Sequence, residues 1–386
     1  MAAQLIFSLF LIVASCFIIW RSSGGFELAA DFLGRRLPAG IKGATINAIA
    51  SSMPEFLTTV FYLFYLRDAD GFSGGLGVSS GSALFNLLII PAMAVLMLVY
   101  MGRKEKVTLN KKVLLREGIV LLLSQLVFIS FLFNDELNGL NGFILVVIYL
   151  AYLGLLFGIT RKKRKVDPGF YTPEEGPMQP WILRILTLDV SSTVLNGKSI
   201  SRSRAWILLA ISTLIMSVGT WVLVLGTDMF GHATNIPLIF VAVVLSAAAT
   251  SVPDTILSMK DAKKGNYDDA VSNALGSNIF DIAFALGLPI LLYNLIYGHS
   301  IKLPAEIMDF TQEVWVFLLL ATVLALAIMY FGKYFTRRKA WLLLGIYVLF
   351  LFFVGTQVNE GLGSIVGDQV KGFLTFLADQ IGELFY

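Results

Sequence analysis

The chain has one cysteine and two histidines among its 386 residues. A single cysteine, Cys16, excludes an intramolecular disulfide and any metal site built from several thiolates. His232 and His299 are far in sequence from the acidic motifs described below, so no set of nitrogen and sulfur ligands for zinc or copper is present. Any metal ion that binds near those motifs is expected to be held by oxygen atoms.

Charged residues are also scarce. They make up 14% of the chain, against about 25% in a typical soluble domain, while 57% of the residues are hydrophobic. This composition excludes an ordinary soluble globule and indicates a polytopic membrane protein whose main partner is the lipid bilayer. The net charge of +3 gives no reason to expect a nucleic acid partner.

Ten apolar stretches are long enough to cross a bilayer, for which about 20 helical residues are needed. We therefore predict an all-α polytopic membrane protein with about ten transmembrane helices. The stretches fall at residues 4–20, 39–66, 75–101, 113–133, 139–160, 205–226, 236–260, 268–296, 312–332 and 339–357.

Basic residues gather in the loops that follow the odd-numbered stretches, and the other loops are mainly acidic. Loops rich in Lys and Arg stay on the cytoplasmic side. We therefore expect a multi-pass protein of the cell membrane (plasma or inner membrane). Both termini are expected to be extracellular or periplasmic, and the linker at 161–204 cytoplasmic.

That linker contains four prolines and divides the chain into two transmembrane repeats, residues 1–160 and 205–357. We interpret Trp181 to Val190, within it, as solvated linker rather than as a short interfacial helix. Each half has five spans, so the second half enters the membrane from the opposite side, which makes an inverted-topology repeat. The extracellular tail, 358–386, has the apolar spacing of an amphipathic helix on the membrane surface; a partner-binding helix or a frayed end is the alternative.

Two short stretches repeat each other in the two halves. Pro54 and Pro253 are 199 residues apart, and Gly81 and Gly276 are 195 apart. Each stretch places a carboxylate inside apolar sequence, where a charge costs at least about 2.5 kcal/mol. We predict ion-binding segments at 44–66, 77–92, 243–262 and 270–289.

Each of the four segments offers oxygen-bearing side chains at positions i and i+4, which lie on one face of a helix. The prolines remove backbone donors and are expected to free carbonyl groups of the preceding turn, while Gly81 and Gly276 permit close helix approach. Such a set of oxygens suits Ca²⁺ or Na⁺ better than Mg²⁺, which sheds its water reluctantly. The candidate side chains are Ser51, Glu55, Ser82, Asn86, Thr250, Ser251, Asp254, Ser277 and Asp281, and the candidate carbonyls belong to Ala48, Ala50, Ala247 and Ala249.

Charge suggests how such a site works. Glu55, Asp254 and Asp281 supply up to three negative charges, which would be heavily penalised without a counter-ion. A divalent cation and several monovalent cations can neutralise the same carboxylates in turn, and that competition is antiport. The third acid leaves room for a monovalent cation beside Ca²⁺, unless Asp281 is protonated.

The two motifs resemble those of the cation/Ca²⁺ exchanger superfamily. The second copy is most similar to the second repeat of the K⁺-dependent Na⁺/Ca²⁺ exchangers. The resemblance implies Glu55 and Asp254 as the central Ca²⁺ and Na⁺ ligands, completed by the hydroxyl and amide side chains named above. It implies exchange of Ca²⁺ for Na⁺, with or without K⁺, and no cofactor. The residues that carry it are Ser251-Val252-Pro253-Asp254 and Gly276-Ser277-Asn278-Ile279-Phe280-Asp281.

Other interpretations remain open at this point. The nearest is a Ca²⁺/H⁺ exchanger, or another divalent cation/proton exchanger, that uses the same carboxylates as proton carriers. An intramembrane enzyme is disfavoured because the chain has no His-Glu-x-x-His motif, and a channel is disfavoured by the inverted repeats. Ser82 and Thr250 are equally compatible with simple bonding between helices. The sequence leaves the oligomeric state undetermined.

Overall fold

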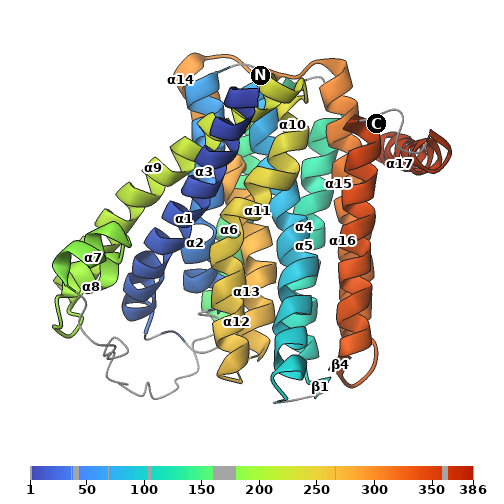
Figure 1. The fold of residues 1–386 in the computed structure, drawn as a ribbon. Helices are drawn as coiled ribbons and strands as arrows, with labels where there is room; N and C mark the ends of the chain where they lie inside the picture. The colour runs from blue at the N-terminus through green and yellow to red at the C-terminus, as the bar shows by residue number, and fades with distance from the viewer. Residues whose placement is uncertain are drawn as a thin grey trace.

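The computed structural model describes residues 2–35, 37, 43–67, 69–102, 106–134, 136–159, 180–265, 267–358 and 364–385. These residues form a bundle of helices (Figure 1). The first half contains α1 (Ala2–Leu33), η1 (Gly43–Asn47), α2 (Ala48–Ser51), α3 (Met53–Phe61), η2 (Tyr62–Leu66), α4 (Ala69–Tyr100), α5 (Lys111–Leu132) and α6 (Gly139–Ile159), where η marks a π-helical turn.

The second half repeats this order after two short helices. These are α7 (Trp181–Leu186) and α8 (Val190–Leu195). The chain continues through α9 (Arg202–Thr234), α10 (Leu238–Val241), η3 (Ala242–Ser246), α11 (Ala247–Thr250), α12 (Val252–Lys263), α13 (Tyr267–Phe280), η4 (Asp281–Ala285), α14 (Gly287–Tyr297), α15 (Ala305–Tyr330), α16 (Arg337–Val358) and α17 (Ser364–Phe385).

Nine helices in the described part of the chain are long and apolar enough to cross a membrane. The predicted span that is not among these nine is 39–66, the second in chain order. A break at Ser52 divides it into the short pieces η1, α2, α3 and η2, and none of these reaches spanning length alone. The predicted fold class is confirmed. The counts differ at residues 39–66, of which 39–42 lie outside the described residues, whereas the equivalent segment Leu238–Lys263 counts as one span although it is broken at Ser251.

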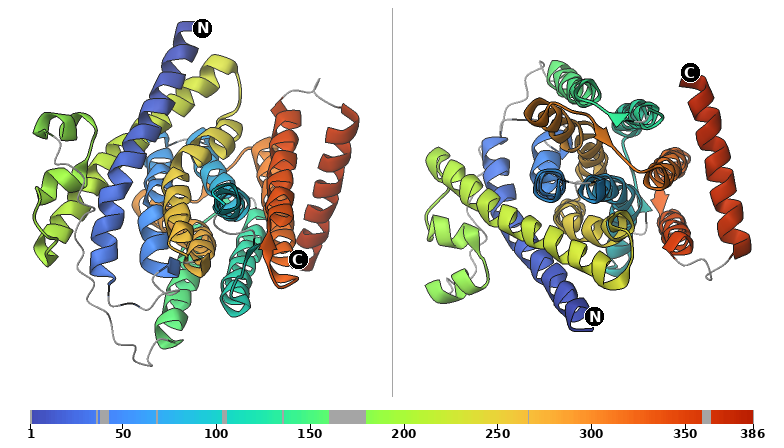
Figure 2. Two further views of the ribbon diagram at one scale, coloured as in Figure 1. Left: turned by 60° about the horizontal axis from the view of Figure 1, so that its bottom comes forward. Right: turned by 90° about the horizontal axis from the view of Figure 1, so that it is seen from above.

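Two predicted spans, 4–20 and 205–226, are too short. The helices that contain them, α1 and α9, run for 32 and 33 residues. They lie against each other over much of their length (Figure 2). Small residues allow this, because a Cβ on Gly219 would lie 2.9 Å from Ile18 and one on Gly25 would lie 2.5 Å from Ser212. The polar ends of α1 and α9 pack on each other, so both helices continue beyond the apolar stretches predicted from the sequence.

Two short antiparallel ribbons join loops at the ends of the bundle. β1 (Lys106–Val107) pairs with β4 (Phe335–Thr336), so the loops after the third and ninth spans share one end. β2 (Glu136–Leu137) pairs with β3 (Ile301–Lys302), which joins the loops after the fourth and eighth spans. Loops predicted to share a side of the membrane are therefore bonded to each other.

Part of the linker is helical, so the prediction of a solvated segment over Trp181 to Val190 was wrong. The short helix α7 exposes apolar side chains, with Trp181 69% and Leu186 70% exposed. Arg21 of α1 donates a hydrogen bond from Nε to the carbonyl of Thr187 at 2.6 Å. An apolar face tied to a spanning helix is the arrangement of an interfacial helix. Residues 160–179 lie outside the described residues.

A pseudo-twofold relation between the halves is visible in two close backbone contacts. A Cβ on Gly81 of α4 would lie 2.0 Å from the carbonyl oxygen of Val243, and one on Gly276 of α13 would lie 3.0 Å from that of Ala44. Val243 is 199 residues after Ala44, the same offset that relates the two prolines. Each glycine thus packs on the equivalent position of the other half, which confirms the inverted repeat.

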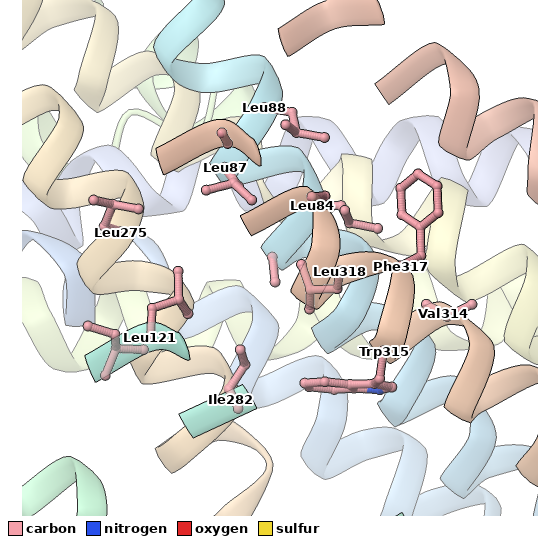
Figure 3. Packing of buried hydrophobic residues seen from close by; sticks show 14 of the residues in the cluster. Leu84, Leu87, Leu88, Leu121, Leu275, Ile282, Val314, Trp315, Phe317 and Leu318 are labelled. Atoms are coloured by element: carbon pink, nitrogen blue, oxygen red, sulfur yellow. The ribbon is translucent and has the colours of Figure 1, made fainter. Parts of the chain in front are cut away.

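The apolar core lies between these crossing helices and α5 and α15. Figure 3 shows Leu84 and Leu87 of α4, Leu275 of α13 and Trp315 of α15 within it. Trp315 is fully buried, and the centre of its ring lies 4.3 Å from the centre of the Phe128 ring. Close packing of this kind fixes the relative positions of the elements that carry the polar residues.

The last helix, α17, runs across the bundle axis at the side of α15 and α16 (Figure 2). Its Leu374 and Ala378 are buried, whereas Phe373 and Phe376 are more than half exposed. Thr375 donates a hydrogen bond to the buried Glu313 of α15 at 3.1 Å. The helix therefore has one face on the bundle and one apolar face outside it, as an interfacial helix would.

The crossing at Gly81 can be tested by adding one methyl group. We expect Gly81→Ala to lower stability by about 1–3 kcal/mol, because the Val243 carbonyl has no room to move without displacing its helix. The thermal unfolding midpoint of the purified protein in detergent measures this. Gly154→Ala is the matched control, since nothing lies within 4 Å of a Cβ there. Equal midpoints for the two variants would contradict the close contact.

Candidate functional site

Two equivalent helix breaks organise the polar centre of the bundle. Ser52 has φ −90° and ψ 6°, and Ser251 has φ −80° and ψ 1°, so both leave the helical conformation in the same way. Pro54 and Pro253 follow within the first turn of the next helix, where the missing proline N–H costs nothing. Each break therefore places an acid, Glu55 or Asp254, in the first turn of a new helix.

Glu55 is held by hydroxyl groups from both halves. Its Oε1 accepts hydrogen bonds from Ser82 of α4 at 3.1 Å and from Ser251 at 3.3 Å. The two serine oxygens are themselves 2.7 Å apart. Glu55 is 1% exposed, so these contacts replace the water that the carboxylate loses on burial.

Asp254 is held by one hydroxyl and two amide groups. Oδ1 accepts hydrogen bonds from Ser277 at 2.7 Å and from Asn273 at 3.5 Å, and Oδ2 accepts one from Asn86 at 3.3 Å. All of these side chains are fully buried. Asn86 belongs to the first half and the other donors to the second, so this acid too is contacted from both halves.

The helix α4 brings the two acids together. Ser82 contacts Glu55 and Asn86 contacts Asp254, and these two positions are one helical turn apart, roughly 6 Å along the axis. In the described part of the chain, neither acid is in a recorded ion pair; the pairs present involve other acids. The two carboxylates therefore share one buried region without a basic partner.

Several oxygen atoms in this region have no hydrogen-bond partner among the described residues, although they are fully buried. They are Glu55 Oε2, Asn86 Oδ1, Ser52 Oγ and both carboxylate oxygens of Asp281. Buried polar atoms are normally paired. A concentration of unpaired acceptor oxygens suits a cation, which needs acceptors and no donors.

The ligand set has to include neutral oxygens. No group of three or more His, Cys, Asp and Glu side chains is close enough to hold a metal ion, as far as the described residues show. Two carboxylates supplemented by serine and asparagine oxygens is a set that Ca²⁺ and Na⁺ accept, whereas zinc and copper would require nitrogen or sulfur.

Asp281 lies beside this centre, next to the hydroxyl groups of Ser52 and Ser82. It is fully buried at the start of η4, and its backbone carbonyl accepts a hydrogen bond from Ser79 of α4 at 3.3 Å. Asn86 occupies the equivalent position in the first half, so the pseudo-twofold related halves differ here by one charge. Both oxygens of the Asp281 side chain remain available to a ligand.

The remaining predicted residues lie in the same region with different roles. Ser51 donates to the carbonyl of Asn47 at 2.9 Å, and Thr250 donates to that of Ala247 at 3.2 Å, which leaves hydroxyl lone pairs free. The carbonyls of Ala48 and Ala247 accept hydrogen bonds from the backbone N–H groups of Ser52 and Ser251.

The prolines affect only two of the four predicted carbonyls. Ala50 and Ala249 stand four residues before Pro54 and Pro253, whose nitrogens carry no hydrogen to donate. These two carbonyls are the ones left without their usual helical donor, so they are the better candidates as ligands. Ala48 and Ala247 are weaker candidates because each already accepts a hydrogen bond.

Ser52 and Asn273 of the centre were not among the residues predicted from the sequence, and Asn273 makes the more extensive contacts. The amide of Asn273 lies 3.5 Å from Asp254 Oδ1 and 3.2 Å from Ser258, and its oxygen is 3.5 Å from Ser51 Oγ. It therefore links both halves. The signal was present, because Asn273 is four residues before Ser277 on one helix face, but its first-half equivalent, Val78, is apolar. A search for polar residues at equivalent positions of both halves therefore misses Asn273.

Comparison with known proteins gives a consistent result. Relatives include the inner membrane protein YrbG of Escherichia coli, 26% identical over 73% of this chain and 79% of its own length. Another is the human sodium/potassium/calcium exchanger 5, 24% identical over 90% of this chain and 80% of its own. The solved structure of the H⁺/Ca²⁺ exchanger CAX has a similar fold, with a TM-score of 0.69, 14% identity, and coverage of 98% of this chain and 90% of that chain.

A family model covers both halves. The model of the sodium/calcium exchanger protein family matches residues 7–158 and 204–356, which leave out the linker and the tail. The two matched segments are the five-span repeats that the helix order and the glycine crossings define. The chain belongs to the sodium/calcium exchanger protein family.

Proposed function

We propose that the chain is a secondary antiporter that exchanges Ca²⁺ for Na⁺ across the membrane by alternating access. The observation that carries this is the pair of buried acids, Glu55 and Asp254, each bonded to side chains of both inverted halves. Family membership and relatives named as sodium/potassium/calcium exchangers support it. The protein is a transporter and not an enzyme.

The substrates are assigned to the oxygen-lined centre between the breaks. Glu55 and Asp254 are the central ligands of Ca²⁺ and of the Na⁺ ions that replace it. Ser51, Ser82, Asn86, Thr250, Ser251 and Ser277 complete the sites together with the Ala50 and Ala249 carbonyls. Asp281 holds a monovalent cation beside them, Na⁺ or K⁺, because its two buried oxygens have no hydrogen-bond partner among the described residues.

The same contacts explain why exchange is coupled. An occupied centre neutralises the acids, while an empty one leaves buried charge, which is costly in a low-dielectric interior. Because each acid is bonded to both halves, relative movement of the halves changes the surroundings of both acids at once. The halves are therefore expected to change orientation mainly when ions are bound.

We place the protein in the plasma or inner membrane with both termini outside the cell. The charge of the basic loops supports this, and the pairing of β1 with β4 brings two of them, those after the third and ninth spans, to one end of the bundle. Exchange of Ca²⁺ for protons is the alternative, because carboxylates in transporters also carry protons.

Loss of either central acid should stop transport. We expect Glu55→Gln and Asp254→Asn to lower Na⁺-driven ⁴⁵Ca²⁺ uptake into proteoliposomes by more than about tenfold, the effect of roughly 1.4 kcal/mol, because a negative ligand is lost. Their thermal midpoints should not fall, since removal of a buried charge without a basic partner costs no ion pair. Near-normal flux in either variant would refute the assigned site.

The role of Asp281 is tested separately. We expect Asp281→Asn to change the dependence of Ca²⁺ uptake on Na⁺ and K⁺ concentration at least about threefold, with a smaller effect on Ca²⁺ affinity, because the amide is neutral. Initial rates of ⁴⁵Ca²⁺ uptake are measured over a titration of each ion. If the Na⁺ and K⁺ dependence is unchanged, Asp281 is not a monovalent-ion ligand.

The ion whose gradient drives Ca²⁺ uptake is identified with the wild-type protein. We expect Ca²⁺ uptake to follow an imposed Na⁺ gradient at constant pH, with a further response to K⁺ if Asp281 binds that ion. Uptake that follows a pH gradient and ignores Na⁺ would establish proton exchange and reject the Na⁺ assignment.

A further inference from the structure

A cavity lined by basic and apolar side chains lies at the end of the bundle, away from the ion-binding centre. It has a volume of about 370 Å³ and lies between the end of η2, the start of α4, the end of α14 and strand β3. Its wall includes three basic side chains, Arg67, His299 and Lys302. None of the residues described as lining it is acidic.

The basic groups are exposed at the mouth of the cavity. Arg67 has a left-handed backbone, with φ 61°, and its Nε donates to the carbonyl of Phe64 at 2.9 Å. Its guanidinium lies 5.8 Å from the centre of the Tyr297 ring. The loop conformation and the ring therefore orient Arg67, and within the described part of the chain its terminal nitrogens make no recorded hydrogen bond.

Lys302 faces the same cavity from the other half of the chain. Among the described residues its one recorded ion pair is with Glu136 at 3.5 Å, and this pair is exposed, with 76% and 43% of the side chains accessible. Exposed ion pairs contribute about 0–1 kcal/mol, so a phosphate group can compete for Lys302. His299 lies beside Tyr293, with ring centres 5.4 Å apart.

The deeper wall of the cavity is apolar. Leu63, Phe72 and Ile301 line it and are 2%, 3% and 7% exposed. Tyrosine rings at the ends of spanning helices are typical of the membrane interface, and here Tyr293 and Tyr297 lie at the end of α14. A ligand with a phosphate at the mouth and a hydrocarbon part inside would meet both kinds of surface.

We propose that this cavity binds the phosphate headgroup of an anionic glycerophospholipid. Arg67 and Lys302 contact the phosphate, and Leu63, Phe72 and Ile301 contact the adjoining apolar part. Because Arg67 belongs to the first half and Lys302 to the second, a bound phosphate connects the two repeats. Guanidinium and ammonium groups form charge-assisted hydrogen bonds with phosphate oxygens.

The test measures lipid binding and not transport, so it is independent of the proposed antiport. Purified full-length protein in neutral detergent is titrated with phosphatidylglycerol or phosphatidylcholine, and bound lipid is counted by native mass spectrometry. We expect phosphatidylglycerol to bind at least tenfold more tightly. Phosphatidylcholine carries its own cation beside the phosphate and should bind weakly.

The double variant Arg67→Gln/Lys302→Gln should lose the preference for phosphatidylglycerol. Arg337→Gln is the matched control, because Arg337 also lies over a tyrosine ring, Tyr100 at 5.5 Å, but next to β4 at the other end of the bundle. It should bind phosphatidylglycerol like the wild type. A thermal midpoint without lipid confirms that each variant is folded.

A parallel titration with inorganic phosphate distinguishes the two sources of the same group. If phosphate alone raises the thermal midpoint and the double variant abolishes the effect, the phosphate site stands and its ligand is a soluble phosphate. If neither probe binds, or if the folded double variant binds phosphatidylglycerol like the wild type, the proposal is wrong.

Discussion

The structure depends on the placement of two carboxylates where water cannot reach them. Glu55 and Asp254 are at most 1% exposed, and a carboxylate in such a place requires compensation by hydrogen bonds or a cation. Neither is in a recorded ion pair in the described residues. The donors instead come from Ser82, Asn86 and Ser277 and their neighbours. The helix breaks, the glycine crossings and the inverted halves all serve to bring these donors to the acids.

The two halves are related by pseudo-symmetry at the glycine crossings, and they differ at the position of Asp281. The equivalent contacts of Gly81 and Gly276 allow each half to pack on the other in the same way, which suits a transporter that must present its centre to both sides. Asp281 departs from this pattern, since its counterpart is Asn86. An ionised Asp281 gives the centre a charge that one divalent ion does not neutralise, and this is the physical reason for proposing a monovalent ion beside Ca²⁺.

Peripheral elements tie the ends of the bundle to the membrane surface. The apolar face of α7 and the exposed phenylalanines of α17 lie outside the packed helices. The basic cavity at Arg67 and Lys302 joins the two repeats at one end of the bundle. These features lie in or beside segments that the sequence presents as loops or tails. Contact with lipid is the role that we propose for their apolar and basic side chains.

The membrane class, the inverted five-span halves and the acids of the centre could be predicted from the amino-acid pattern, because carboxylates and repeated prolines inside apolar stretches are visible without a structure. Tertiary structure decided which groups meet. The sequence pairs Ser82 with Asn86 on one helix, whereas in the fold Ser82 contacts Glu55 and Asn86 contacts Asp254. Asn273 joined the centre, and Ala48 and Ala247 became weaker ligand candidates than Ala50 and Ala249. Residue spacing predicts which side chains share one face of a helix, but the packing of the two halves determines which residues that face contacts.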